Sequence, residues 1–201
     1  MKKWLLPILA VLLLTQPLSA QAAPSAIDQV RGTVEHVLEV LRDKGLDKTA
    51  RLDQLRGIIR ARFDFALMSQ WTLGPYWRKA NPDQQQRFIA LYSDLLEANY
   101  RGKIEQYTDQ KVNYLGERVE GHRAEVQTEI VTDQANIPLV YRLNLEGDKW
   151  MVYDVVIEGV SLVRTYRGTF GEIARKDGID GLLEQVAQKV REQQDNTGGK
   201  G

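Results

Sequence analysis

The residues with the clearest chemical potential surround a serine that follows an apolar, strand-like segment. Gly159, Ser161 and Val163 lie at the spacing of a hydrolase nucleophile elbow, in which a serine stands between two glycines on a turn from strand to helix. Val163 replaces the second glycine of that motif, and the elbow belongs to parallel sheets, whereas the neighbouring strands here have an antiparallel pattern. Ser161 is therefore expected to cap the N-terminus of a helix.

Two carboxylates, Asp154 and Glu158, fall on the same side of the last strand-like segment. The rise of a strand separates them by about 13 Å. One interpretation is a general acid and base inside an open, cone-shaped sheet. The other is a buried carboxylate paired with Arg164 or Arg167, next to an exposed glutamate at the strand end. The second is favoured, because buried carboxylates are normally paired.

Metal and thiol chemistry have little support in the composition. The chain has two histidines and no cysteine. His36 stands near Glu35 and Glu39, and His122 follows a hairpin glycine, so neither has a partner at the spacing of a zinc motif. Without cysteine there is no thiol nucleophile, disulfide or thiolate ligand. We expect solvated histidines and no metal.

The elements that must position these residues follow from the apolar periodicity. Spacing of three and four residues predicts helices over 27–41, 52–63, 88–104, 162–173 and 183–190. Between them the period changes to two, which predicts strands over 112–114, 123–130, 137–146 and 150–157, the last apolar on both faces. The connections are of hairpin length. The chain is therefore predicted to be an α+β domain in which an antiparallel, four-stranded meander sheet packs against several helices.

The first residues have the order of a secretory signal peptide. Two lysines precede an apolar stretch over 4–14, and Ala20 and Ala22 occupy the small-residue positions of a cleavage site. We expect cleavage after Ala22. The expected parts of the chain are the signal peptide 1–22, one domain over 23–194 and a polar, disordered tail over 195–201.

Charge excludes one class of partner. The chain carries 27 basic and 27 acidic residues, interleaved along its length. Nucleic-acid binding normally needs a clustered basic excess, so we expect no nucleic acid.

Three stretches in combination carry a family resemblance. Residues 62–77 read RFDFALMSQWTLGPYW, residues 88–100 form the apolar face of the long helix, and residues 150–170 read WMVYDVVIEGVSLVRTYRGTF. Together they span about residues 30–190 and resemble the MlaC family, also called the toluene-tolerance family, of periplasmic phospholipid shuttles in the maintenance of outer-membrane lipid asymmetry.

The resemblance implies a helical layer and a sheet that enclose a deep apolar pocket, with the acyl tails inside and the headgroup outside. It implies a passive carrier, without catalytic residues or cofactors. The implied partners are phospholipid, an outer-membrane lipoprotein–porin complex and an inner-membrane ABC transporter with a lipid-binding ring subunit.

Apolar residues on the dry face of the sheet and on the facing helices could line such a pocket. The expected lining residues are Phe65, Met68, Trp71, Leu91, Leu95, Val126, Ile130, Leu139, Tyr141, Leu143 and Val152. Two other functions stay open. One is a small-molecule lyase or isomerase that uses Asp154 or Glu158, and the other is an assembly factor that presents its helices to a membrane complex.

Overall fold

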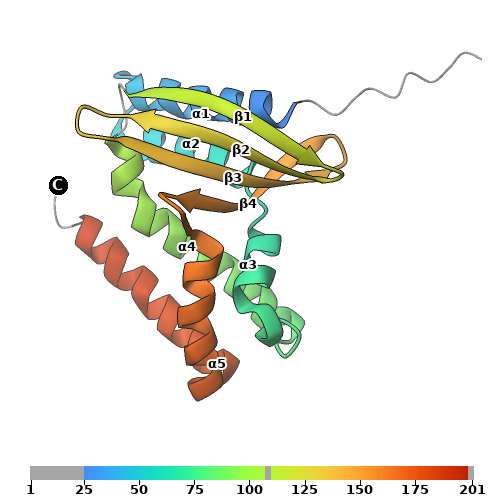
Figure 1. Cartoon of the computed structure of the whole chain (residues 1–201). Helices are drawn as coiled ribbons and strands as arrows, with labels where there is room; N and C mark the ends of the chain where they lie inside the picture. The colour runs from blue at the N-terminus through green and yellow to red at the C-terminus, as the bar shows by residue number, and fades with distance from the viewer. Residues whose placement is uncertain (1–24, 107–109, 199–201) are drawn as a thin grey trace, which may run out of the picture.

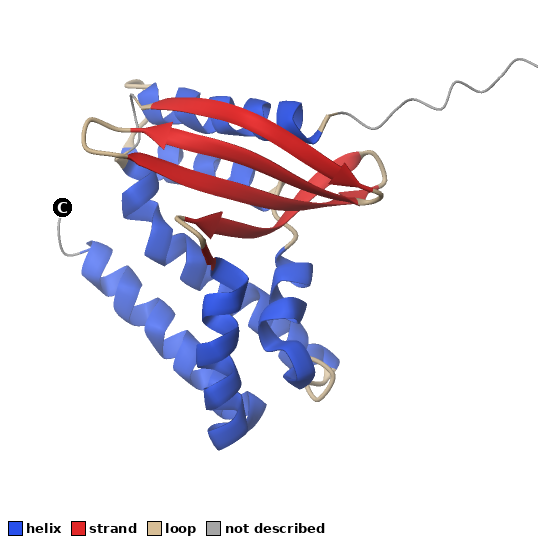
Figure 2. Cartoon of the chain, in the orientation of Figure 1, coloured by secondary structure: helices blue, strands red, loops and turns tan. Residues whose placement is uncertain are grey.

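The structure is a computed structural model that describes residues 25–106 and 110–198. Within those residues a curved sheet lies between two groups of helices (Figures 1 and 2). Helix α1 lies along one face of the sheet and α2 packs against α1, whereas α3, α4 and α5 form a separate layer beneath the sheet. The α+β class predicted from the sequence is confirmed.

The sheet is antiparallel, and its strands pair in sequence order. The strands are β1 (Lys111–Glu120), β2 (Arg123–Val131), β3 (Asn136–Glu146), β4 (Lys149–Ile157) and β5 (Val160–Ser161). The meander is confirmed, with one strand more than the four predicted. Glu158 and Gly159 have φ values of 49° and 82°, so the chain reverses at once and β5 pairs with the end of β4.

The helices begin where the sequence provides caps. They are α1 (Ala26–Arg42), α2 (Lys48–Arg60), α3 (Phe65–Leu73), the short 3₁₀ helix η1 (Gly74–Tyr76), α4 (Pro82–Glu105) and α5 (Leu162–Gly198). The Ser25 hydroxyl accepts a bond from the Asp28 amide at 3.3 Å. Asn81 and Gln84 form a reciprocal capping box at 2.9 and 3.0 Å. Each cap satisfies amides that lack a partner within the helix.

Helix α5 consists of two arms that meet at Gly178. The φ and ψ of Gly178 are 72° and −177°, which is not helical, so the two C-terminal helices expected from the sequence join at a sharp bend (Figure 1). The second arm continues through residues 195–198 of the expected tail. Residues 199–201 and the expected signal peptide 1–22 lie outside the described residues. Among the residues described, no helix is long and apolar enough to cross a membrane.

The apolar interior is divided into two principal cores. The sheet core joins residues of α1 with residues of β2, β3 and β4. The helical core joins α3, α4 and both arms of α5. Phe63, which is partly buried, packs against both cores. The candidate site must be sought in or between these two regions.

Candidate functional site

One face of the sheet is apolar and is covered by α1. Strand register places Ala124 opposite Leu143 and Val126 opposite Tyr141. These side chains share the face because alternate residues of a strand point the same way. Ala26 and Val30 of α1 are buried in the same core. We call this the inner face of the sheet.

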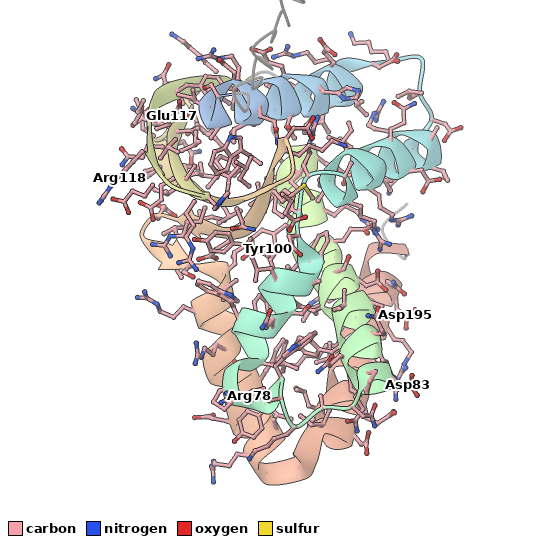
Figure 3. All side chains as sticks on the ribbon, turned by 90° about the vertical axis from the view of Figure 1, so that its right-hand side faces the viewer. Arg78, Asp83, Tyr100, Glu117, Arg118 and Asp195 are labelled. Carbon is pink, nitrogen blue, oxygen red and sulfur yellow. The ribbon has the colours of Figure 1, made fainter. Side chains whose placement is uncertain are left out.

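Polar contacts fix the position of α1 on the sheet. The Gln29 side chain accepts a bond from the Trp150 amide at 3.1 Å and donates to the Trp150 carbonyl. At the other contact, the Glu117 carboxylate accepts from the Ile27 amide at 2.7 Å and from the Ser25 hydroxyl at 3.1 Å. A carboxylate at this place complements the positive end of the helix. Figure 3 shows Glu117 beside the start of α1.

Strand β4 is covered on both faces, as its two-sided apolar pattern predicts. Val152 pairs with Leu143 and Asp154 pairs with Arg142, so Tyr153 is the extra residue of a β-bulge. Tyr153 belongs to the helical core, and its ring centroid lies 5.1 Å from that of Trp71. The bulge therefore lets one strand contribute to both cores.

Several apolar residues of the inner face remain partly accessible. The strand residues that pack against the sheet core without being fully buried include Tyr114, Ile130, Ile137, Tyr141 and Ile157, and Val34 of α1 and Leu162 of α5 lie beside them. Burial raises the pKa of Tyr141 to about 12, although the side chain keeps some accessible surface. It also raises the pKa of Tyr114 to about 12. Both tyrosine rings therefore lie in surroundings of low dielectric constant.

The expected lining residues are divided between the two cores. The inner face contains Val126, Ile130, Leu139, Tyr141, Leu143 and Val152. The helical core contains Phe65, Met68, Trp71, Leu91 and Leu95. The two sets were expected to face each other across one interior. In the structure α1 covers much of the inner face, and the sets approach each other where Phe63 contacts both cores. The lining stays a prediction.

Asp154 is a buried structural carboxylate with three hydrogen-bond donors. Its oxygens accept from the Ser161 hydroxyl at 2.7 Å, the Val163 amide at 3.1 Å and the Arg142 guanidinium at 3.2 Å. The expected cation was Arg164 or Arg167. That expectation is wrong, because Arg142 lies directly opposite Asp154 on β3. Through these hydrogen bonds the carboxylate connects β3, β4 and the start of α5.

The remaining catalytic candidates do not assemble into a site. Ser161 belongs to β5, and its hydroxyl also accepts from the Arg164 amide at 3.1 Å, which is the predicted N-cap bond. Glu158 is exposed in the turn after β4 and does not share a cavity with Asp154. His36 and His122 are both exposed. In the described part of the chain no three His, Cys, Asp or Glu residues gather as metal ligands.

Two surface hollows lie outside the sheet core, and neither contains an expected lining residue. One, of about 300 Å³, lies between η1 and the first arm of α5. The other, of about 320 Å³, is polar and lies where α2, α4 and the end of α5 meet. There Arg56 binds Glu97 through both carboxylate oxygens, and Arg101 adds a bond at 2.9 Å. Burial acts to raise the pKa of Glu97, but these bonds outweigh it and the pKa is lowered.

The fold defines a class: an α+β protein with an antiparallel meander sheet, one apolar face of which packs against α1. The comparisons are specific. The sequence profile described as "MlaC protein" matches residues 31–188, and the chain belongs to the MlaC family. The resemblance carried by residues 62–77, 88–100 and 150–170 is confirmed.

Three related proteins have informative descriptions. The toluene tolerance protein ttg2D of Pseudomonas putida is 29% identical over 202 residues, which cover 94% of each chain. The intermembrane phospholipid transport system binding protein MlaC of Haemophilus influenzae is 27% identical over 124 residues, 59% of this chain and 58% of its own. A phospholipid-binding protein from Ralstonia solanacearum, solved with a phospholipid, has a TM-score of 0.78 and 26% identity over 84% of this chain and 98% of its own.

Sequence reasoning missed the polar residues that connect the sheet to α1 and its strands to one another. Gln29, Glu117 and Arg142 each contact an element distant in sequence. Arg142 had a usable signal, since it lies in the wet-face register of a strand next to the strand that carries Asp154. Gln29 and Glu117 had none, because helix-to-sheet contacts depend on how α1 is placed.

Proposed function

We propose that this protein carries phospholipid across the periplasm, holding the acyl chains against the inner face of the sheet. The observation that carries the proposal is the likeness to the Ralstonia solanacearum protein, which was solved with a phospholipid and is matched over 98% of its length. The partly accessible apolar residues around Tyr141 are the surface that we assign to the tails.

The energetics favour such a surface for a passive carrier. Two tails of about 15 methylenes each, at about 0.8 kcal/mol per methylene, remove on the order of 20 kcal/mol of unfavourable hydration when they are buried. A carrier interior must therefore be about as apolar as the bilayer. Exchange between two such environments is nearly neutral, so the carrier itself needs no catalytic group or energy source.

The route of transport belongs to the same proposal. The lipid passes between an outer-membrane lipoprotein–porin complex and an inner-membrane ABC transporter with a lipid-binding ring subunit, which maintains outer-membrane lipid asymmetry. Secretion would follow cleavage after Ala22. An intact mass corresponding to a chain that starts at Ala23 would support this, and a retained 1–22 segment would contradict it.

The test of lipid carriage is extraction. Protein purified from the periplasmic fraction without detergent is extracted with organic solvent, and diacyl phospholipid is quantified against protein. We expect a near-stoichiometric amount. Folded protein without bound phospholipid would contradict the proposal and would return attention to a small-molecule enzyme.

A further inference from the structure

The hollow between η1 and the first arm of α5 has the composition of a protein-binding surface. Its walls combine apolar and cationic side chains, and its lining residues include Leu73, Pro75, Tyr76, Arg167 and Arg175. Aromatic residues and arginine are enriched at protein interfaces, where they supply contact area and directed hydrogen bonds. The hollow lies on the helical layer, whereas the surface assigned to acyl chains lies on the sheet.

Two glycines leave the floor of this hollow open. Gly168 and Gly171 are on α5, and a Cβ at either position would have no neighbouring atom within 4 Å. Arg164 and Arg175 lie at the same helical spacing on either side of them, so the glycines separate two cations along one face of the helix. A segment of another chain can therefore approach the α5 backbone between these charges.

The guanidinium of Arg167 lies beside Gly74 at the edge of the hollow. Gly74 has a φ of 54°, and a Cβ there would lie 2.9 Å from Nη2 of Arg167, so the guanidinium rests in the space that the glycine leaves. Arg167 forms no ion pair with any residue that the structure describes. A guanidinium without an ion pair inside the chain can bind an acid without breaking an existing one.

The surroundings of the hollow are basic in a chain that is neutral as a whole. Arg78 and Lys79 follow η1, and the Lys79 ammonium lies 5.1 Å from the centroid of the Tyr76 ring. In Figure 3 Arg78 lies at the end of the molecule opposite α1. The single acid among the lining residues is Glu172. This local excess contrasts with 27 basic and 27 acidic residues overall.

We propose that the hollow between η1 and α5 is a docking site for an acidic, partly apolar segment of a partner protein. Carboxylates of the segment pair with Arg167 and Arg175, and its apolar side chains contact Tyr76 and the glycine floor. Charge complementarity sets the choice of partner and speeds encounter. This site rests on the proposed function, in which the carrier must dock at membrane complexes.

The probe for this site is a fluorescent synthetic peptide of alternating Glu and Leu, with a Lys and Leu peptide as its charge control. Arg167→Glu replaces the cation by an anion, and Gly171→Leu fills the floor. The matched controls are Arg191→Glu, an exposed arginine on the second arm of α5, and Gly102→Leu, an exposed glycine of α4 with open space around it. Thermal melting verifies that each variant is folded.

We expect the acidic peptide to bind the wild type, and Arg167→Glu and Gly171→Leu each to weaken binding about tenfold or more. Both controls should bind as the wild type does. Equal binding of the Lys peptide, unchanged binding by Arg167→Glu, or no binding of the acidic peptide would overturn the proposal. So would binding to phosphatidylglycerol vesicles with the same dependence on the variants, which would assign the hollow to a membrane surface. Phospholipid content is measured on the same samples, and its absence would count against the proposed function alone.

Discussion

At the scale of single residues, Asp154 has a structural role at a junction of three elements. The carboxylate is buried and receives hydrogen bonds from Ser161, Val163 and Arg142. Each of these donors belongs to a different part of the fold, namely β5, α5 and β3. A group arranged in this way stabilises the junction between these elements.

Replacing Asp154 by asparagine should therefore reduce stability and leave function in place. The amide keeps the shape of the side chain but loses the charge opposite Arg142 and one of the two acceptor oxygens. We expect a loss of about 1.5–3 kcal/mol in the free energy of unfolding, measured by urea denaturation. Phospholipid bound per folded molecule should not change. Glu158→Gln, at an exposed position, serves as the control and should be nearly neutral. An unchanged unfolding free energy in Asp154→Asn would contradict the structural role.

Glu97 gives the molecule a pH-dependent contribution to stability. Burial acts to raise its pKa, but hydrogen bonds from Arg56 and Arg101 dominate, so the folded-state pKa lies below 4.5, the value that represents the unfolded chain. The stabilisation is therefore fully present above about pH 4.5 and is lost as the pH falls through the folded-state pKa.

Glu97→Gln should remove this contribution. We expect the free energy of unfolding of the variant to be about 1–2 kcal/mol lower than that of the wild type at pH 7. The difference should shrink below pH 4.5, because the wild-type carboxyl then becomes protonated as well. Urea denaturation at a series of pH values measures both quantities. If the difference in unfolding free energy stayed constant at every acidic pH measured, the contribution of Glu97 would come from packing and not from charge.

At the scale of elements, the sequence correctly predicts the features that depend on neighbouring residues: helix caps, strand alternation and hairpin turns. Ser25 and Asn81 cap helices as their side chains and spacing indicate. The alternation in β2 and β3 correctly separates inner-face from outer-face residues. Hairpins form at Gly121 and Gly147, whose φ values of 59° and 61° glycine adopts without strain.

Three features were not predicted, because the local periodicity of apolar residues does not indicate them. Strand β5 depends on a tight turn that includes Glu158 at positive φ, which a residue with a Cβ rarely adopts. The bulge at Tyr153 shifts the register of β4, and a period-two pattern does not reveal such a shift. The placement of α1 on the inner face depends on side-chain contacts such as that of Gln29 with Trp150. The bulge and the placement of α1 together explain why the expected lining residues are divided between two cores.

Gly178 is the element-scale feature with the largest expected effect on folding. Its backbone conformation, φ 72° and ψ −177°, is almost restricted to glycine, and it reverses α5 so that the second arm joins the helical core. Gly178→Ala should cost about 1–3 kcal/mol in the free energy of unfolding.

Gly57→Ala is the matched control for this prediction. Gly57 lies within α2 with open space around the position of a Cβ, so the substitution should be neutral or stabilising by about 0.5–1 kcal/mol. Thermal or urea denaturation compares the two. If Gly178→Ala were as stable as Gly57→Ala, the bend would not require a glycine.

At the scale of the whole molecule, the apolar interior consists of a helical core and a sheet core. The helical core contains large, fully buried side chains such as Phe88, Tyr92 and Phe170, whose rings pack within 6 Å of one another. The sheet core has a comparable buried centre around Val126 and Leu143, and partly accessible apolar residues pack against both cores. The inner face of the sheet core is the surface that we propose for the acyl chains.

The central claim is that acyl chains lie against the inner face, and the most direct test places the same large side chain on the two faces of one strand. Ile130→Trp adds an indole among the partly accessible residues, and Gln127→Trp adds it to the exposed, opposite face of β2. Both proteins are purified without detergent, and the bound diacyl phospholipid is quantified per protein. We expect Ile130→Trp to lower the phospholipid content severalfold while its melting temperature stays near that of the wild type, and Gln127→Trp to retain the full amount. Full phospholipid content in folded Ile130→Trp, or an equal loss in both variants, would contradict the claim.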